Sequence, residues 1–208
     1  MPIDTPSGQI PLNLRPSHPF TYESFVETPS NMAALTLVRA WPKWPSPVLR
    51  LYGPIGSGKT HLGEAWALHT GGTFIDNADL MDEADLFNLI NRALIGEVPG
   101  LLMASELLPR DWSIKMPDLL SRLLAAPEVE LTEPDEASLE SILRALFLQQ
   151  GREVSRDVVI YILAHVDRSI DALRALVKTL DELAAVEKKD ITKAFTAKYI
   201  KTNLELDL

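Results

Sequence analysis

The sequence predicts an α/β domain built on a parallel sheet, followed by a small domain made of helices alone. Up to Leu131, short apolar runs alternate with amphipathic helical stretches, which is typical of a parallel sheet covered by helices. After Leu131 only helical stretches follow. We therefore expect the α/β core over residues 20–131 and the helical domain over residues 132–208. Residues 1–19 are rich in Pro, Ser and Thr and show no sustained period, which predicts a flexible tail.

The composition narrows the classes of protein. With 46% hydrophobic and 24% charged residues, the 208-residue chain has the make-up of an ordinary globular protein. The absence of cysteine excludes disulfides and thiolate metal sites. The net charge is −9, whereas a protein that holds DNA alone needs a basic surface, so we expect a protein partner and no direct nucleic-acid binding. No apolar run approaches the roughly 18 residues that span a membrane, so the cytoplasm is the expected location.

The elements of the core are marked by their ends. A helical stretch over residues 31–41 is stopped by Pro42, and the apolar run at residues 48–52 ends at a glycine, which predicts a buried strand. A helix from Lys59 to about Leu68 is expected next. The remaining core elements are expected in this order: a strand at 73–75, a helix at 82–94, a strand at 101–104, a helix at 118–124 and a strand at 129–131.

The helical domain shows start and stop signals of its own. Residues 132–135 begin a helix that Gly151 ends, and Ser155 is expected to cap the next one. A third helix is predicted over residues 169–185. Thr192 begins a last, short helix.

A glycine-rich loop follows the first predicted strand. Residues 53–60 read GPIGSGKT, which fits the phosphate-binding pattern G-x-x-x-x-G-K-[ST] without a mismatch, with a strand before it and a helix after it. Glycines let backbone N–H groups curl around phosphate oxygens, and the start of the helix adds partial positive charge. We therefore predict binding of ATP or ADP with Mg²⁺. The residues expected to contact the nucleotide are Gly53, Gly56, Ser57, Gly58, Lys59, Thr60 and His61.

The metal ion needs an acid near the loop. The Thr60 hydroxyl is expected to ligate Mg²⁺, and Asp76, directly after the strand at 73–75, is the candidate acid that holds the ion through water. An Asx turn leading into a helix is an equally weighted interpretation of Asp76. Asn77 follows it, and an amide cannot act as a base, so hydrolysis by this chain alone is expected to be weak or absent.

Several segments in sequence order resemble the AAA+ family of the replication initiator DnaA, and within it the Hda-like group that inactivates the initiator, in the form found in alphaproteobacteria. These segments are FTYESFV at 20–26, LYG at 51–53, GKTHL at 58–62, LFNLIN at 86–91, LLMAS at 101–105 and DLLSRL at 118–123. The resemblance covers nearly the whole chain and ends without the initiator's DNA-binding domain. It implies an AAA+ P-loop parallel sheet, here shortened, followed by a small helical lid.

The resemblance also implies roles for three further positions. Ser105 matches the sensor of the terminal phosphate, and Arg122 matches the arginine finger, which in this family acts on the nucleotide of a neighbouring subunit. Arg168 matches the second sensor, with Arg174 as the fallback. Without the family, these residues would be a capped strand end and surface arginines on helices.

The tail contains a peptide that resembles the one with which Hda binds the replication sliding clamp. A glutamine would fix one end by hydrogen bonds while aliphatic side chains enter an apolar pocket. The residues concerned are Gln9, Ile10, Pro11, Leu12 and Leu14, within the segment 9–14.

One spacing departs from the family. Asp76 comes 17 positions after Lys59, where the family usually fits a further strand and helix. Either an edge strand has been lost, or the strand at 73–75 fuses the start of one element to the end of another. The second case leaves Asp76 without a certain counterpart.

Three functions follow from these features. The first is a nucleotide-binding regulator that docks on the sliding clamp and presents Arg122 to ATP on the replication initiator. The second is an adaptor stabilised by bound nucleotide, without ATPase-stimulating activity. The third, an independent P-loop kinase or ATPase, lacks a substrate-binding insert and a clear catalytic base. A finger acting on a neighbour implies subunit contacts and leaves a homo-oligomer open.

Overall fold

The structure is a computed structural model that describes residues 20–204. The predicted clamp-binding peptide, Gln9 to Leu14, lies outside these residues, as does the rest of the predicted tail. Within the described part of the chain, no helix is long and apolar enough to cross a membrane.

The described residues form a parallel four-stranded sheet in the order β2-β3-β1-β4. The two central strands, β1 (Val48–Tyr52) and β3 (Leu101–Ser105), are almost wholly buried. They are flanked by two short strands, β2 (Thr73–Ile75) and β4 (Glu128–Glu130). A strand buried on both faces reads as an apolar run, which is why the sequence marked the central strands so clearly.

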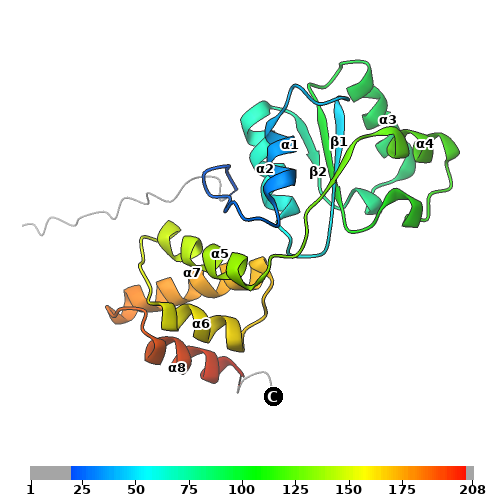
Figure 1. Cartoon of the computed structure of the whole chain (residues 1–208). Helices are drawn as coiled ribbons and strands as arrows, with labels where there is room; N and C mark the ends of the chain where they lie inside the picture. Colours follow the sequence, from blue (N-terminus) through cyan, green and yellow to red (C-terminus); the bar gives the residue numbers. More distant parts are fainter. Residues whose placement is uncertain (1–19, 205–208) are drawn as a thin grey trace, which may run out of the picture.

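Helices cover both faces of this sheet (Figure 1). On one face, α1 (Met32–Arg39) and α2 (Lys59–Thr70) pack on the side chains of Leu49, Leu51 and Leu102. On the other face, α3 (Glu83–Leu94) and α4 (Pro117–Ala125) pack on Val48, Leu101 and Met103. Two short 3₁₀ turns, η1 (Ala78–Leu80) and η2 (Pro109–Asp111), complete the core.

The C-terminal half is a bundle of four helices with its own apolar core. The helices are α5 (Glu136–Gln149), α6 (Arg156–His165), α7 (Ile170–Glu187) and α8 (Lys193–Leu204). The Asp135 carboxylate caps α5 by accepting from Ser138 N at 2.8 Å. Ser155 stands at the N-cap of α6, as predicted, but its side chain makes no capping hydrogen bond. The last helix has 12 residues and is longer than predicted.

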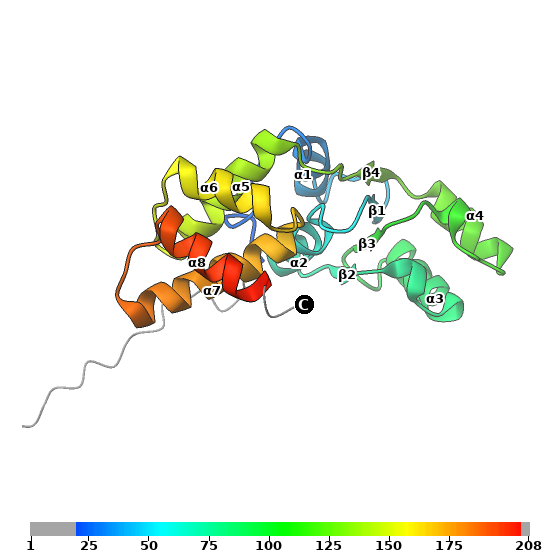
Figure 2. The ribbon, with the colours of Figure 1, turned by 90° about the horizontal axis from the view of Figure 1, so that it is seen from below.

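The helical bundle lies at the end of the sheet where α2 begins, so the glycine-rich loop faces it (Figure 2). A Cβ placed on Gly56 of the loop would come within 3.3 Å of the Cβ of Ser169, the N-cap of α7. The predicted fold class, a shortened parallel sheet followed by a small helical domain, is confirmed.

The short spacing before Asp76 has a simple structural form. Helix α2 ends at Thr70, Gly71 takes a left-handed φ of +70°, and β2 starts at Thr73. Strand β2 pairs with β3, and it is the only strand between Lys59 and Asp76. Asp76 therefore sits at the carboxyl edge of the sheet, beside the strand that ends in Ser105.

Candidate functional site

In the glycine-rich loop, the lysine side chain forms hydrogen bonds with backbone carbonyl groups of the loop itself. The residue Lys59 is 7% exposed, and its Nζ atom donates to the carbonyl oxygens of Gly53 and Pro54, each at 2.8 Å. Gly56 and Gly58 have φ angles of +75° and +98°, which L side chains rarely adopt, so glycine is needed at both positions. The result is a tight turn with a buried cation beside it.

Three features of this turn fit a phosphate chain. Gly58 at the N-cap of α2 supplies no side-chain hydrogen bond, which leaves the first N–H groups of the helix open for an anion. The Ser57 hydroxyl is buried, and within residues 20–204 it has no hydrogen-bond partner. Burial also lowers the pKa of the Lys59 ammonium, and an anion beside it would offset that cost.

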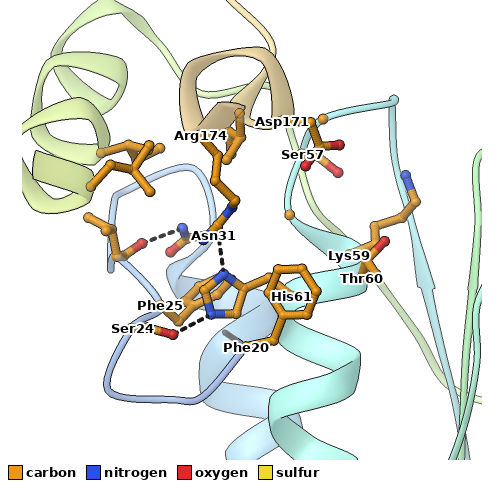
Figure 3. Close-up of a pocket in the computed structure, with 16 residues that line it drawn as sticks. Phe20, Ser24, Phe25, Asn31, Ser57, Lys59, Thr60, His61, Asp171 and Arg174 are labelled. Carbon is orange, nitrogen blue, oxygen red and sulfur yellow. Dashed lines mark hydrogen bonds between the residues drawn. The ribbon is translucent and has the colours of Figure 1, made fainter. Parts of the chain in front are cut away.

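A pocket lies between this loop, the segment 20–31 and the helices α5 and α7 (Figure 3). Its polar lining includes Ser57, Lys59, Thr60, Asp171 and Arg174. Its apolar part is lined by Phe25, Val26, Ile142, Leu146 and Ile170. A concave site with an apolar end and a few convergent polar groups suits a small ligand that carries a ring at one end and charges at the other.

Arg174 is the second cation of the pocket. It donates from Nη2 to His61 Nδ1 at 3.2 Å, and its guanidinium carbon lies 5.3 Å from the centre of the Phe20 ring. Burial lowers its pKa, and its Nε atom is buried without a partner among the described residues. Among residues 20–204, neither Arg174 nor Lys59 takes part in a salt bridge. Asp171 of α7 also lines the pocket, and its charge raises the pKa of Arg174 against the larger effect of burial. The pocket therefore holds two cations and one carboxylate, without a salt bridge from either cation among the described residues.

The structure places the two candidate arginines of the helical domain in different surroundings. Arg168, the preferred candidate from the sequence, precedes the cap of α7, is exposed and does not line the pocket. Arg174, the fallback, does line it. The reason is helical spacing, because Arg174 follows Ile170 by four positions and so shares the face of α7 that meets the pocket.

His61 lines the same pocket but is engaged by protein groups. It is 8% exposed, and its Nε2 atom lies 3.0 Å from both the Thr21 carbonyl oxygen and the Ser24 hydroxyl. Burial lowers its pKa to about 4, and the Arg174 charge acts in the same direction. The side chain is therefore a neutral imidazole at pH 7.

The two candidate metal-site residues are in direct contact. The Thr60 hydroxyl donates to Asp76 Oδ2 at 2.7 Å, so the carboxylate reaches the first turn of α2. Asp76 Oδ1 also accepts from Asn77 N at 3.0 Å, a bond to the next residue, whereas an Asx turn would bond the N–H group two residues on. A hydroxyl beside a carboxylate is an oxygen donor pair of the type that Mg²⁺ prefers, and these are the residues that would hold it.

Ser105 lies at the end of β3 beside the loop. Its carbonyl oxygen accepts from Gly53 N at 3.3 Å. Its hydroxyl is turned to the following residues and donates to the Leu107 carbonyl oxygen at 2.8 Å. Ser105 is not among the residues that line the pocket.

Arg122 lies at the other edge of the sheet. It is on α4, near Ser46 and Val48 at the start of β1, with its guanidinium carbon 5.1 Å from the centre of the Phe87 ring. The five residues of β1 separate it from the loop by roughly 13 Å of strand. Arg122 therefore does not reach the loop of its own chain.

The sequence did not identify the residues that form the walls of the pocket. Phe20, Phe25 and Val26 come from one side, and Ile142 and Leu146 of α5 come from the other. Ile142 and Leu146 also belong to the apolar core of the helical bundle. Because these residues meet through folding alone, no local pattern could have marked them.

Comparisons with known proteins agree with this architecture. No protein-family model matches the chain. The chromosomal replication initiator protein DnaA of Lactobacillus delbrueckii subsp. bulgaricus is 24% identical over 230 residues, which cover 86% of this chain and 50% of the relative. The chain thus spans about half the length of the curated relatives that it matches.

Solved structures show the same fold. Domain III of DnaA from Thermotoga maritima superposes with a TM-score of 0.72 at 20% identity and covers 88% of this chain and 96% of that domain. AMPPCP-bound DnaA from Aquifex aeolicus gives a TM-score of 0.63 at 20% identity, covering 77% of this chain and 65% of that one. The chain therefore has the fold of the AAA+ domain of the replication initiator DnaA.

Proposed function

We propose that this chain binds ATP or ADP in the pocket beside the glycine-rich loop and acts as a regulator of replication initiation. The observation that supports nucleotide binding best is that Lys59 and Arg174, two cations without a salt-bridge partner among the described residues, line one pocket at the open start of α2. The DnaA structure from Aquifex aeolicus, which has this fold, is AMPPCP-bound.

Each part of the pocket would hold one part of the nucleotide. Lys59 would exchange the carbonyl oxygens of Gly53 and Pro54 for the outer phosphate oxygens. Arg174 would neutralise phosphate charge from the side of α7. Thr60 and Asp76 would hold Mg²⁺, which would supply further charge neutralisation between the phosphates when bound. The apolar part of the pocket would take the base.

The regulatory step would use Arg122 on a second molecule. Arg122 lies beyond the reach of its own loop and its guanidinium is held on the Phe87 ring, so it suits a nucleotide presented by another subunit. We propose that the peptide Gln9 to Leu14 docks the chain on the sliding clamp and that Arg122 then promotes hydrolysis of ATP held by the replication initiator. The acidic net charge of −9 fits protein partners better than direct DNA binding.

The test is ATP hydrolysis by the initiator in the presence of DNA-loaded clamp and this chain. Wild-type chain should accelerate hydrolysis, and Arg122→Ala should abolish a stimulation of roughly 1,000-fold, which is the lower range for an arginine finger. Arg156→Ala, which removes an exposed arginine of the helical domain, is the matched control and should stimulate normally. An unchanged rate with Arg122→Ala would overturn the regulatory proposal.

A second candidate function is an adaptor that is only stabilised by nucleotide. It is favoured by Asn77, because the residue after Asp76 carries an amide that cannot act as a general base. Tight ADP binding together with no effect on initiator hydrolysis would support the adaptor. Clamp pull-down with and without residues 9–14, scored in the same preparations, tests the docking step separately.

A further inference from the structure

His61 connects three separate parts of the chain. Its Nδ1 atom is 3.2 Å from Arg174 Nη2 of α7, and its Nε2 atom is 3.0 Å from the Thr21 carbonyl oxygen in the segment that leads into the core. The rings of Phe20 and Phe25 pack against the imidazole, each with a centroid distance of 5.1 Å. Figure 3 shows this ring between the arginine above it and the segment below it.

The contacts determine the tautomer of His61. A guanidinium can only donate hydrogen bonds, so Nδ1 must accept and cannot carry a proton. The single ring proton is then on Nε2, which donates towards the Thr21 carbonyl oxygen and the Ser24 hydroxyl. The imidazole therefore relays a directed hydrogen-bond chain from α7 to the segment 20–25.

This chain fixes the place of the Arg174 guanidinium. His61 holds one edge of it and the Phe20 ring lies 5.3 Å from its central carbon. A long side chain without such contacts would have several rotamers, and it would lose that freedom when it bound a phosphate. Holding the cation beforehand removes part of this cost from ligand binding.

We propose that His61 is a positioning residue, which holds Arg174 ready for phosphate and transmits the presence of nucleotide to the segment 20–25. The inference rests on the proposed function of the pocket as a nucleotide site. A second contact supports the link to the segment, because Gln149 Nε2 of α5 donates to the Ser24 carbonyl oxygen at 2.9 Å. Nucleotide binding should thus stabilise the segment 20–25, which lies between the predicted tail and α1.

The test is a double-mutant cycle on the Kd for Mg²⁺–ADP, measured by titration calorimetry on the full chain. His61→Phe keeps a ring between Phe20 and Phe25 but removes the acceptor, and it should weaken binding about 10-fold, as should Arg174→Ala. The double variant should be no weaker than either single variant by more than about 2-fold. His61→Gln, which restores an acceptor and a donor, should recover binding to within about 3-fold of wild type.

His69→Phe is the matched control on the same helix. His69 is exposed, lies outside the pocket and contacts the same segment through Tyr22, so its replacement should leave the Kd unchanged. Hydrogen exchange at residues 21–25 should slow on addition of Mg²⁺–ADP in wild type and in His61→Gln, but not in His61→Phe. Equal protection in all three proteins would overturn the proposed transmission.

Two outcomes separate this inference from the proposed function. Absence of ADP binding to the wild-type chain overturns both. Binding to wild type with multiplicative losses, so that the double variant is about 100-fold weaker, overturns the inference alone. Histidine ¹⁵N NMR of the wild-type chain tests the geometry even if His61→Phe fails to fold, because a proton on Nδ1 of His61 at pH 7 would contradict the hydrogen-bond chain.

Discussion

Arg174 and Arg122 lie near opposite edges of the same sheet and have different surroundings. Arg174 lies in a pocket built from the loop, the segment 20–31 and two helices of the helical domain, with His61 as its hydrogen-bond partner. Arg122 lies on α4 near the start of β1, where its guanidinium group packs over the face of the Phe87 ring. Within residues 20–204, neither arginine forms a salt bridge.

The difference between them indicates two kinds of ligand. A cation enclosed by several elements of one chain suits an anion that the same chain binds. A cation at the other edge of the sheet, which packs on an aromatic ring and forms no salt bridge within residues 20–204, suits an anion that another molecule brings. The variants below, ordered by the size of the expected change, test this division.

The largest effect is expected for the loop lysine. Lys59→Ala should weaken binding of Mg²⁺–ADP about 1,000-fold, because it removes two charge-assisted hydrogen bonds worth about 2 kcal/mol each. Arg122→Ala should leave the same Kd within about 2-fold, since it lies at the other edge of the sheet. Titration calorimetry on both variants measures these Kd values. A large loss of affinity for Arg122→Ala would contradict the division between a site that uses Lys59 and a separate role for Arg122.

Acid should lower the stability of the folded chain through protonation of His61. Its pKa is lowered to about 4 in the folded chain, so between pH 6.5 and pH 4 the unfolded chain binds more protons than the folded one. Stability is then complete above pH 6.5 and falls as the pH drops to 4, by about 3 kcal/mol. Urea unfolding at pH 7 and pH 4 should show this loss for wild type and a smaller loss for His61→Gln. Identical losses would contradict a buried neutral imidazole.

The two arginines of the helical domain should differ in the same assay. Arg174→Ala should weaken Mg²⁺–ADP binding about 10-fold, in line with one charge-assisted hydrogen bond. Arg168→Ala, an exposed position at the start of α7, should change the Kd by less than about 2-fold. The reverse order would restore the assignment made from the sequence and move the ligand away from the observed pocket.

The smallest effect is expected at the acid beside the loop. Asp76→Asn keeps the shape but removes the charge that accepts from Thr60. It should weaken ADP binding roughly 3-fold with Mg²⁺, since an acid that holds the metal through water contributes less than a direct ligand. The same titrations in EDTA should show no difference. An effect of equal size without Mg²⁺ would identify Asp76 as a structural turn residue instead.

The sequence predicted the elements around the loop because each has a local signal. Burial on both faces makes β1 and β3 apolar runs, and the glycines at 56 and 58 are required by positive φ angles. The helical domain could be recognised for a similar reason, since Asp135 and Ser169 cap two of its helices with hydrogen bonds to backbone N–H groups. Local sequence signals were therefore sufficient to predict these helices and strands.

The pocket could be predicted only in part, because its other walls come from distant parts of the chain. Phe20 and Arg174 contact each other and His61, although no local sequence pattern marks either residue as a partner of His61. The family resemblance placed a functional arginine near the start of α7 but could not decide between two positions six residues apart. The structure places only Arg174 of the two in the pocket lining, because the face of α7 that meets the pocket depends on how α7 packs on the loop.

In the proposed complex, the turn around Lys59 and the cation from α7 together enclose a phosphate chain. The sharpest test is titration calorimetry of the wild-type chain with ADP and with adenosine, both with Mg²⁺. We expect clear heat with ADP and binding of adenosine that is weaker by at least about 100-fold, because the charged contacts go to the phosphates. Equal affinities for the two compounds, or no heat with ADP, would contradict it.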